Sequence, residues 1–191
     1  MFIARNRETG QRIDITQYSD PKLELSNAVC VCPFCDSQLI IRDGPVRTAH
    51  FAHRSIECDS SLIRHPESIE HHEGKRFVAN YLQEQFADLL EEINIQFEVH
   101  IKEANRIADV LIQFPMGWRV AHEIQLSPIS RNQLQERTED YARSGIDTIW
   151  WLGRKADNAD NRAWCIEKFG CTYTINFTAS NQNETIYPKP D

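Results

Sequence analysis

The amino-acid sequence predicts an α/β protein in which a three-layer domain follows a small, β-rich, metal-binding module. Three observations lead to this prediction. From residue 67 onward the hydrophobic pattern indicates a helix, three strands, a helix and a strand. The second and third of these strands contain acidic residues among apolar ones. Ahead of them stands a Cys-x2-Cys pair, with histidines soon after it.

The bulk composition is that of a globular protein. The chain has 191 residues, 41% hydrophobic and 26% charged, which suits one ordinary domain plus a small one. No apolar run approaches the roughly 18 residues of a membrane span, and the N-terminus lacks the apolar core of a signal peptide. We therefore expect a cytoplasmic protein without a membrane partner, whose six cysteines stay reduced and available for metal. A net charge of −7 weighs against broad electrostatic binding of nucleic acid, but it is compatible with an enzyme that meets DNA through a local basic patch and bound divalent cations.

Residues 105–127 are the centre of the pattern, and they read as two apolar strands joined by a tight turn around Met116. Asp109 and Glu123 are equidistant from Met116, so they should face each other across the two strands. The period of two puts Gln125 on the same face. Two carboxylates inside an apolar hairpin are costly unless a cation or a proton lies between them, so the hairpin hints at a metal site.

The other elements follow from periodicity and from start and stop signals. Apolar spacings of three and four predict a helix over residues 67–90, and strict alternation predicts a strand over residues 93–101. Ser130 should cap a helix that Gly145 ends. Further elements are expected at 147–152 (strand), 163–169 (helix) and 172–177 (strand). A meander of three strands with helices on both faces makes the three-layer core.

Two polar stripes flank the acidic hairpin. Glu67, His71 and Lys75 are spaced by four residues and share one helix face. That face either points at the acids or is the solvated start of a charged helix. A second stripe at the same spacing consists of Gln133, Arg137 and Tyr141. A competing interpretation makes the two acids an inert pair bridged to Arg106 or Arg137.

This arrangement of side chains suits hydrolysis of a phosphodiester. Mg²⁺ prefers oxygen ligands, so Asp109 and Glu123 can hold one ion or bracket two. Such an ion activates water and neutralises charge on the phosphate. Gln125 can orient that water, but an amide cannot serve as a base or a cation. A positive charge could come from Lys75, and Arg137 could hold a phosphate.

The cysteine pair predicts a zinc site in the first module. The two-residue gap between Cys32 and Cys35 lets both thiolates reach one tetrahedral ion. A second pair of ligands should follow a β-hairpin, and His53 and Cys58 are the expected ones. His50 is the alternate ligand, because its strand position can turn it away from His53.

Other interpretations of the cysteine pair are weaker. A Cys-Pro-x-Cys redox motif needs a following helix, and a hairpin signal follows instead. A zinc deaminase carries its His-x-Glu before the cysteines, whereas the histidines here come after them. A metal-free loop is the third alternative. A module this small is only marginally stable without a disulfide or a bound metal. Structural zinc supplies on the order of 10 kcal/mol of folding free energy in such modules, so a structural role is enough to explain a zinc site.

Several motifs in one order resemble the competence protein CoiA-like nucleases, a branch of the PD-(D/E)XK restriction-endonuclease-like superfamily. The resemblance extends over residues 30–153. Its carriers are Cys-Pro-Phe-Cys at 32–35, His-Phe-Ala-His at 50–53, Cys58, Pro-Glu-Ser-x-x-His-x-x-Gly-Lys at 66–75, Arg-x-x-Asp-Val at 106–110, Glu-Ile-Gln-x-Ser at 123–127, Arg137-x3-Tyr141 and Ile-Trp-Trp-Leu at 149–152. Many separate motifs in one order are more specific than any one of them.

The resemblance implies a restriction-endonuclease-like core and a Mg²⁺- or Mn²⁺-dependent DNA nuclease with an N-terminal zinc-finger-like module. Asp109 matches the Asp of the superfamily motif, and Glu123 matches its second acid. Gln125 stands where the superfamily usually has Lys, although some relatives are similar in using Glu-x-Gln. Lys75 is the candidate for the missing lysine.

The resemblance also implies roles for residues outside the hairpin. Glu67 corresponds to a helix glutamate that helps to hold the metal in relatives, with Glu70 as the alternative. Arg137, Tyr141 and Arg106 are expected to bind the DNA, and His71 lies among the catalytic side chains. Relatives are linked to the processing of incoming DNA during natural transformation. DNA is therefore the expected partner, together with recombination proteins.

The predicted organisation is a zinc-finger-like domain over residues 1–63, a PD-(D/E)XK nuclease-like domain over residues 64–178 and a loose tail over residues 179–191. The predicted function is metal-dependent cleavage of DNA. The alternative is a non-catalytic nucleic-acid- or protein-binding module on a degenerate nuclease fold, because Gln125 replaces the usual lysine.

Overall fold

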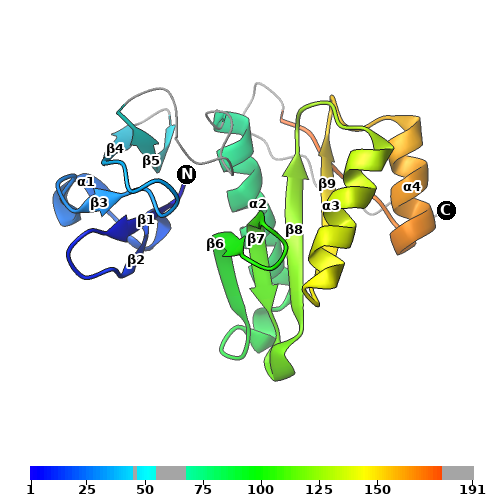
Figure 1. Ribbon diagram of the computed structural model, residues 1–191, viewed down its shortest axis with the longest axis horizontal. Helices are drawn as coiled ribbons and strands as arrows, with labels where there is room; N and C mark the ends of the chain where they lie inside the picture. Colours follow the sequence, from blue (N-terminus) through cyan, green and yellow to red (C-terminus); the bar gives the residue numbers. More distant parts are fainter. Residues whose placement is uncertain (45–46, 55–67, 178–191) are drawn as a thin grey trace. The chain divides into compact units, whose positions relative to one another are not determined.

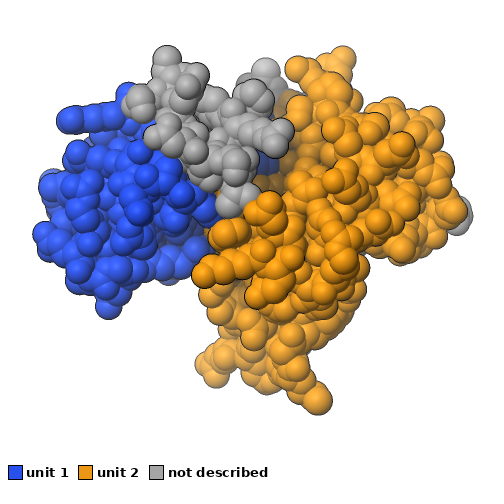
Figure 2. All heavy atoms as spheres, in the orientation of Figure 1, with its two compact units in different colours: residues 1–73 blue, residues 74–191 orange. Residues whose placement is uncertain are grey.

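The chain folds into two compact units, residues 1–73 and 74–191 (Figure 2). The computed structural model describes residues 1–44, 47–54 and 68–177. The boundary between the units falls within helix α2 (Ile69–Gln85). The domain boundary expected after residue 63 and the expected tail over 179–191 both lie outside the described residues. The fold belongs to the mixed α/β class that the hydrophobic pattern predicts.

Unit 1 is built from short strands. Its first sheet has the order β2-β1-β3, and β4 pairs with β5 in a separate antiparallel hairpin. The elements are β1 (Ile3–Asn6), β2 (Arg12–Asp14), η1 (Ile15–Gln17), α1 (Pro21–Glu24), β3 (Cys30–Val31), β4 (Leu39–Gly44) and β5 (Arg47–His53). Phe2, Ile15, Leu39 and Phe51 are fully buried and form the centre of this small core. The hairpin after the cysteine pair is therefore confirmed.

Unit 2 is organised around a five-stranded sheet of order β10-β9-β8-β7-β6 (Figure 1). β6 (Asn94–Ile101), β7 (Arg106–Gln113) and β8 (Arg119–Gln125) form an antiparallel meander, and β9 (Asp147–Gly153) and β10 (Tyr173–Ile175) continue it in parallel. The remaining elements are η2 (Ala87–Leu89), η3 (Pro115–Gly117), α3 (Arg131–Arg143) and α4 (Ala159–Phe169). The predicted order of helix, three strands, helix and strand is present.

Local signals place the helix ends. The side chain of Ser130 caps α3, and Gln133 completes a capping box with it. Gly145 follows the helix with a φ of +66°, the left-handed region that favours glycine. The first long helix is shorter than expected. It ends at Gln85, and the single turn η2 takes the place of its predicted last turns.

Helices cover both faces of the sheet (Figure 1). A Cβ placed on Gly74 of α2 would lie 3.0 Å from Cγ2 of Ile124, so glycine permits a close approach there. The α3 side chains instead reach Glu123, the neighbouring residue of β8. Because consecutive strand residues point to opposite faces, α2 and α3 lie on opposite sides of β8.

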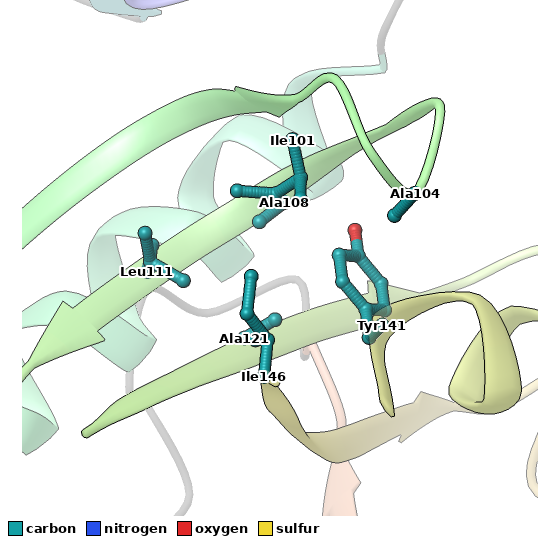
Figure 3. Packing of buried hydrophobic residues seen from close by; sticks show 7 residues of the cluster. All are labelled: Ile101, Ala104, Ala108, Leu111, Ala121, Tyr141 and Ile146. Carbon is teal, nitrogen blue, oxygen red and sulfur yellow. The ribbon is translucent and has the colours of Figure 1, made fainter. Parts of the chain in front are cut away.

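Among the described residues, two apolar clusters join α3 and α4 to the sheet. Figure 3 shows the first, in which Tyr141 of α3 lies over side chains of β7 and β8. The second joins α3, β9 and α4 and consists of Leu134, Trp150, Leu152, Ala156, Trp164 and Cys165. Both clusters anchor α3, so the polar side chains of this helix are held in fixed positions against β8. Among the described residues, no helix has both the length and the apolar composition needed to cross a bilayer.

Candidate functional site

The two acids of the central hairpin lie opposite each other on neighbouring strands. Val110 pairs with His122, so Asp109 lies opposite Glu123 at the next position. The turn between the strands contains Met116, at a φ of +65°. Equal spacing of the acids about Met116 predicted this register. The Asp109 carboxylate accepts a hydrogen bond from the Ile124 backbone N–H at 2.9 Å, which holds it against β8.

Glu123 is buried, and two side chains of α3 contact its carboxylate. Arg137 forms an ion pair with its Oε2, and the Tyr141 hydroxyl donates a hydrogen bond to its Oε1 at 2.7 Å. The Arg137 guanidinium also lies over the Trp150 ring, 4.9 Å from its centroid. Helix α3 thus supplies one cation and one hydroxyl to the buried carboxylate.

Burial sets the electrostatics of this group. Burial is the main reason that the pKa of Glu123 is raised to about 7; Arg137 lowers the pKa, the Asp109 charge raises it, and the Tyr141 hydrogen bond lowers it. Burial and the Glu123 charge hold the pKa of Tyr141 far above its ordinary value, so its hydroxyl remains a donor. Burial alone would lower the pKa of Arg137, but Glu123 and Asp109 together raise it, so the guanidinium stays charged.

Gln125 belongs to the same network. Arg137 donates a hydrogen bond to its Oε1 at 3.1 Å, and its own Nε2 donates to the Ser127 carbonyl at 2.8 Å. The amide therefore positions the arginine at the edge of the acids. Ser127 also accepts a hydrogen bond at its hydroxyl, a role that the strand pattern did not predict.

Lys75 and Glu98 form a second buried charge pair. Nζ of Lys75 donates to Oε1 of Glu98 at 2.5 Å, and the two side chains are 0% and 5% exposed. Glu98 lies opposite Asp109, between the pairs Phe97–Val110 and Val99–Ala108, and its φ is +51°. Lys75 comes from α2, whereas Arg137 comes from α3. The carboxylate that Lys75 contacts therefore belongs to β6, the strand next to that of Asp109.

Sequence reasoning missed Glu98. Strict alternation of side chains placed Glu98 on the solvent-facing side of its strand. This pattern gives no sign that the backbone at Glu98 is left-handed. A signal was nevertheless available on the helix. Lys75 shares the spacing of the buried Val78 and Leu82, so it lies on the buried stripe of α2.

The remaining predicted site residues are placed differently. Glu67 lies outside the described residues, and Glu70 is exposed at the start of α2. His71 is half-buried, and its backbone N–H donates to the Ser68 hydroxyl at 3.2 Å. Arg106 donates to Asp140 of α3 at 2.7 Å, so it joins β7 to α3. The structure brings together Asp109, Glu123, Gln125, Arg137 and Tyr141.

His122, next to Glu123, is a buried histidine that the sequence pattern did not single out. Nε1 of Trp151 donates a hydrogen bond to its Nδ1 at 3.0 Å. Burial lowers the pKa of His122 to about 3 from an ordinary value of 6.5. The ring is therefore neutral in the folded protein throughout the physiological range.

Acid is expected to destabilise the protein through His122. Below pH 6.5 the unfolded chain binds a proton that the folded chain refuses down to about pH 3. The free energy of unfolding should thus fall with falling pH in this window, by about 1.4 kcal/mol per pH unit from this group. Urea unfolding between these limits should show a shallower pH slope for His122→Gln, whose amide oxygen can still accept from Trp151. His100→Gln, at an exposed position, is the control; equal slopes for the parent and His122→Gln would contradict the assignment.

Unit 1 brings three metal-ligating side chains together. The ligand atoms of Cys32, Cys35 and His53 all lie within 4.8 Å of one another. Sγ of Cys35 is 3.4 Å from Nε2 of His53. His50, on the same strand, instead lies with its ring 4.9 Å from the ring of His72. Two thiolates and an imidazole are ligands that suit zinc.

Two other cysteines lie near this group in the sequence. Cys58, the expected fourth ligand, lies outside the described residues. Cys30 is buried on β3, and burial raises the pKa of its thiol. A thiol with a raised pKa is a poorer metal ligand than a thiolate, so Cys30 suits a packing role.

Comparisons with known proteins identify the family. A family model described as "Competence protein CoiA, nuclease-like domain" matches residues 67–190, and one described as "Competence protein CoiA, N-terminal domain" matches residues 15–61. The chain is 31% identical over 122 residues to a protein named Competence protein CoiA from Bacillus subtilis (strain 168). That match spans 64% of this chain and 31% of the relative, so the chain covers about a third of the relative's length. No solved structure matches. Because the nuclease-like model alone covers more than half of the chain, the protein belongs to the competence protein CoiA family.

Proposed function

We propose that unit 2 is a deoxyribonuclease that depends on Mg²⁺ or Mn²⁺ and is built on a restriction-endonuclease-like core. The observation that carries this proposal is the pairing of Asp109 with Glu123 on neighbouring strands, beside Arg137. The family's nuclease-like domain supports the reaction class. A role in the processing of DNA during competence is the corresponding biological setting.

The donor set fits a hard divalent cation. Asp109 and Glu123 offer carboxylate oxygens, the ligands that Mg²⁺ and Mn²⁺ prefer. The Asp109 charge helps to raise the pKa of Glu123, so the two carboxylates repel each other. A cation held by both would remove this repulsion and favour the ionised form of Glu123. When bound, such an ion supplies an activated water and neutralises charge on the phosphodiester.

The chain's own side chains have separable tasks in this mechanism. Asp109 and Glu123 would hold the metal. Tyr141 orients the Glu123 carboxylate through its hydroxyl donor. Arg137, which stays charged and is partly exposed, would bind the scissile or a neighbouring phosphate. Gln125 holds Arg137 in place from the other side.

The test is cleavage by the purified chain. Linear single-stranded and double-stranded DNA would be incubated with Mg²⁺, with Mn²⁺ and with EDTA. We expect cleavage with at least one metal and none with EDTA. Absence of cleavage of both DNA forms under all metal conditions would refute the nuclease assignment.

One observation favours a second candidate function. The residue at position 125 is a glutamine and not a lysine, and its amide hydrogen-bonds with Arg137 and Ser127. Unit 2 would then be a non-catalytic module that binds DNA or a protein on a degenerate nuclease fold. This candidate requires DNA or partner binding without turnover and a gain of cleavage in Gln125→Lys.

We further propose that unit 1 holds a structural zinc ion through Cys32, Cys35, His53 and Cys58. The convergence of the first three supports this site. The purified protein should contain one zinc per chain, and cobalt substitution should give the spectrum of a tetrahedral site with four protein ligands. Cys35→Ser should lose the metal, and Cys171→Ser, in unit 2, should keep it. Equal metal content in both variants would exclude this site.

A further inference from the structure

One end of unit 2 exposes large apolar side chains. Among the described residues of this unit, Leu89, Leu90, Met116 and Trp118 are 38%, 46%, 105% and 55% exposed, and we call these four residues the apolar end. The first two follow α2, and the last two belong to the turn between β7 and β8. Asn94 pairs with Gln113, so both segments lie at the same end of the sheet (Figure 1).

Aromatic rings connect the apolar end with a cavity. Phe86 contacts Phe114 edge to face at 5.1 Å between ring centroids, and Phe114 stacks on Trp118 at 4.6 Å. All three rings line a cavity of about 640 Å³, as do Tyr81 and Trp151. A cavity of this size is large enough to take several side chains of a partner. Among the described residues, the lining does not include the acids, Gln125 or Arg137 of the candidate nuclease site.

The rim of this region is acidic. Asp88, Glu91 and Glu92 are exposed on either side of Leu89 and Leu90. Glu139 and Asp147 line the cavity and are exposed, and Asp147 accepts a hydrogen bond from Nε1 of Trp118 at 2.8 Å. Lys168 is the basic residue in the lining. The negative rim opposes a phosphate backbone or an anionic lipid and favours a cationic occupant.

From this placement we propose that the apolar end and its cavity form a docking surface for a segment of a protein partner whose apolar anchor residues are flanked by Lys or Arg. Exposed apolar patches on soluble proteins mark interaction sites, and tryptophan is enriched among residues that dominate binding energy. The apolar anchors of the partner enter the cavity, which is lined by side chains of α2, α3, α4, β9 and the β7–β8 hairpin. Its cations face Asp88, Glu91, Glu92, Glu139 and Asp147. The surface is separate from the nuclease site, so it can hold a protein while that site holds DNA.

The probe for the first test is a dye-labelled 14-residue amphipathic peptide of leucine and lysine, titrated with the full chain by fluorescence anisotropy. A second peptide carries glutamate at every lysine position. We expect saturable binding of the lysine peptide that weakens with salt, and no binding of the glutamate peptide. Equal binding of the two peptides, or no binding of the lysine peptide at about 1 mM protein, would overturn the proposal.

A pair of variants separates apolar docking from general attraction to an acidic protein. Leu90→Asp with Met116→Asp adds negative charge, so pure electrostatics predicts tighter binding of the lysine peptide. We expect at least tenfold weaker binding, because apolar residues of the partner lose the contacts that Leu90 and Met116 of the apolar end supply. Leu23→Asp, at an exposed leucine of unit 1, is the matched control and should change binding less than twofold. Unchanged binding by the double variant would refute the docking surface.

Three further measurements show whether a loss of peptide binding is a loss of docking alone. Thermal unfolding should be unchanged in the double variant, because both positions are exposed. Its DNA cleavage, measured as for the parent, should also be unchanged, since neither residue belongs to the candidate nuclease site. Sedimentation velocity of the free chain tests the other occupant. A dimer that the double variant abolishes would assign the surface to a second copy of the chain and overturn the peptide-segment assignment.

Discussion

Glu123→Gln is expected to abolish metal-dependent cleavage of DNA, with the rate lowered by about a thousandfold or more. Glutamine keeps the volume of the side chain and can accept from Tyr141, but it lacks the charge that holds a divalent cation. Asp109→Asn should have the same effect for the same reason. The measurement is cleavage of linear DNA in Mg²⁺ and in Mn²⁺.

The control for this loss is Glu84→Gln, at an exposed acid of α2, which should cleave like the parent. Circular dichroism and zinc content should match the parent in all three variants, which separates loss of the reaction from loss of the fold. Cleavage by Asp109→Asn and Glu123→Gln at the parental rate would remove the acids from the mechanism.

Glu123→Gln is also expected to change the pH dependence of the free energy of unfolding. Burial raises the pKa of Glu123 to about 7 from 4.5, so the folded chain binds a proton that the unfolded chain has released between these values. The free energy of unfolding contributed by this group should fall as pH rises from 4.5 to about 7. Glu123→Gln should lose that part of the pH dependence. Cleavage by the parent should rise with pH toward 7, because the carboxylate must ionise to bind metal.

Lys75→Met is expected to lower the free energy of unfolding by about 3 to 5 kcal/mol. Methionine fills the volume of the lysine stem, but it leaves the Glu98 carboxylate buried without its cation. The cost of an uncompensated buried charge exceeds the small net value of the intact pair. Urea unfolding at neutral pH measures the loss, and Lys102→Met, at an exposed lysine, should change stability by less than about 1 kcal/mol.

A double variant tests the physical reason. Lys75→Met with Glu98→Leu removes both charges and should recover most of the lost stability, because an apolar pair of similar volume can replace a buried ion pair. A double variant as unstable as Lys75→Met alone would contradict charge burial as the cause. DNA cleavage by the stable double variant then decides whether Lys75 also takes part in the reaction, as the replacement of the usual lysine by Gln125 suggests.

Much of the fold could be predicted because its signals are local. The capping box of Ser130 and Gln133 defines the start of α3 from neighbours three residues apart. The register of Asp109 and Glu123 follows from alternation and the position of one turn. The hairpin after the cysteine pair follows from similar signals, and it brings His53 to Cys32 and Cys35.

Other features could not be predicted because they depend on contacts between distant segments. The positions of Arg106 and Arg137 in the sequence could not show that Arg137 pairs with Glu123 while Arg106 pairs with Asp140. The burial of Glu98 depends on a left-handed φ and on a lysine from α2, and neither feature produces a periodic pattern in the sequence.

Spacing along the chain was enough to predict the order of helices and strands, the facing acids and the cysteine pair with its histidines. Which cation meets which acid depends on how distant segments pack against one another. Long charged side chains reach several neighbours from one backbone position, and the packing of α2 and α3 on opposite faces of the sheet selects among them. That selection gave Arg137 to Glu123 and Lys75 to Glu98. The apolar end was likewise decided in three dimensions, because the pairing of β6 with β7 brings two turns together that are separated along the chain.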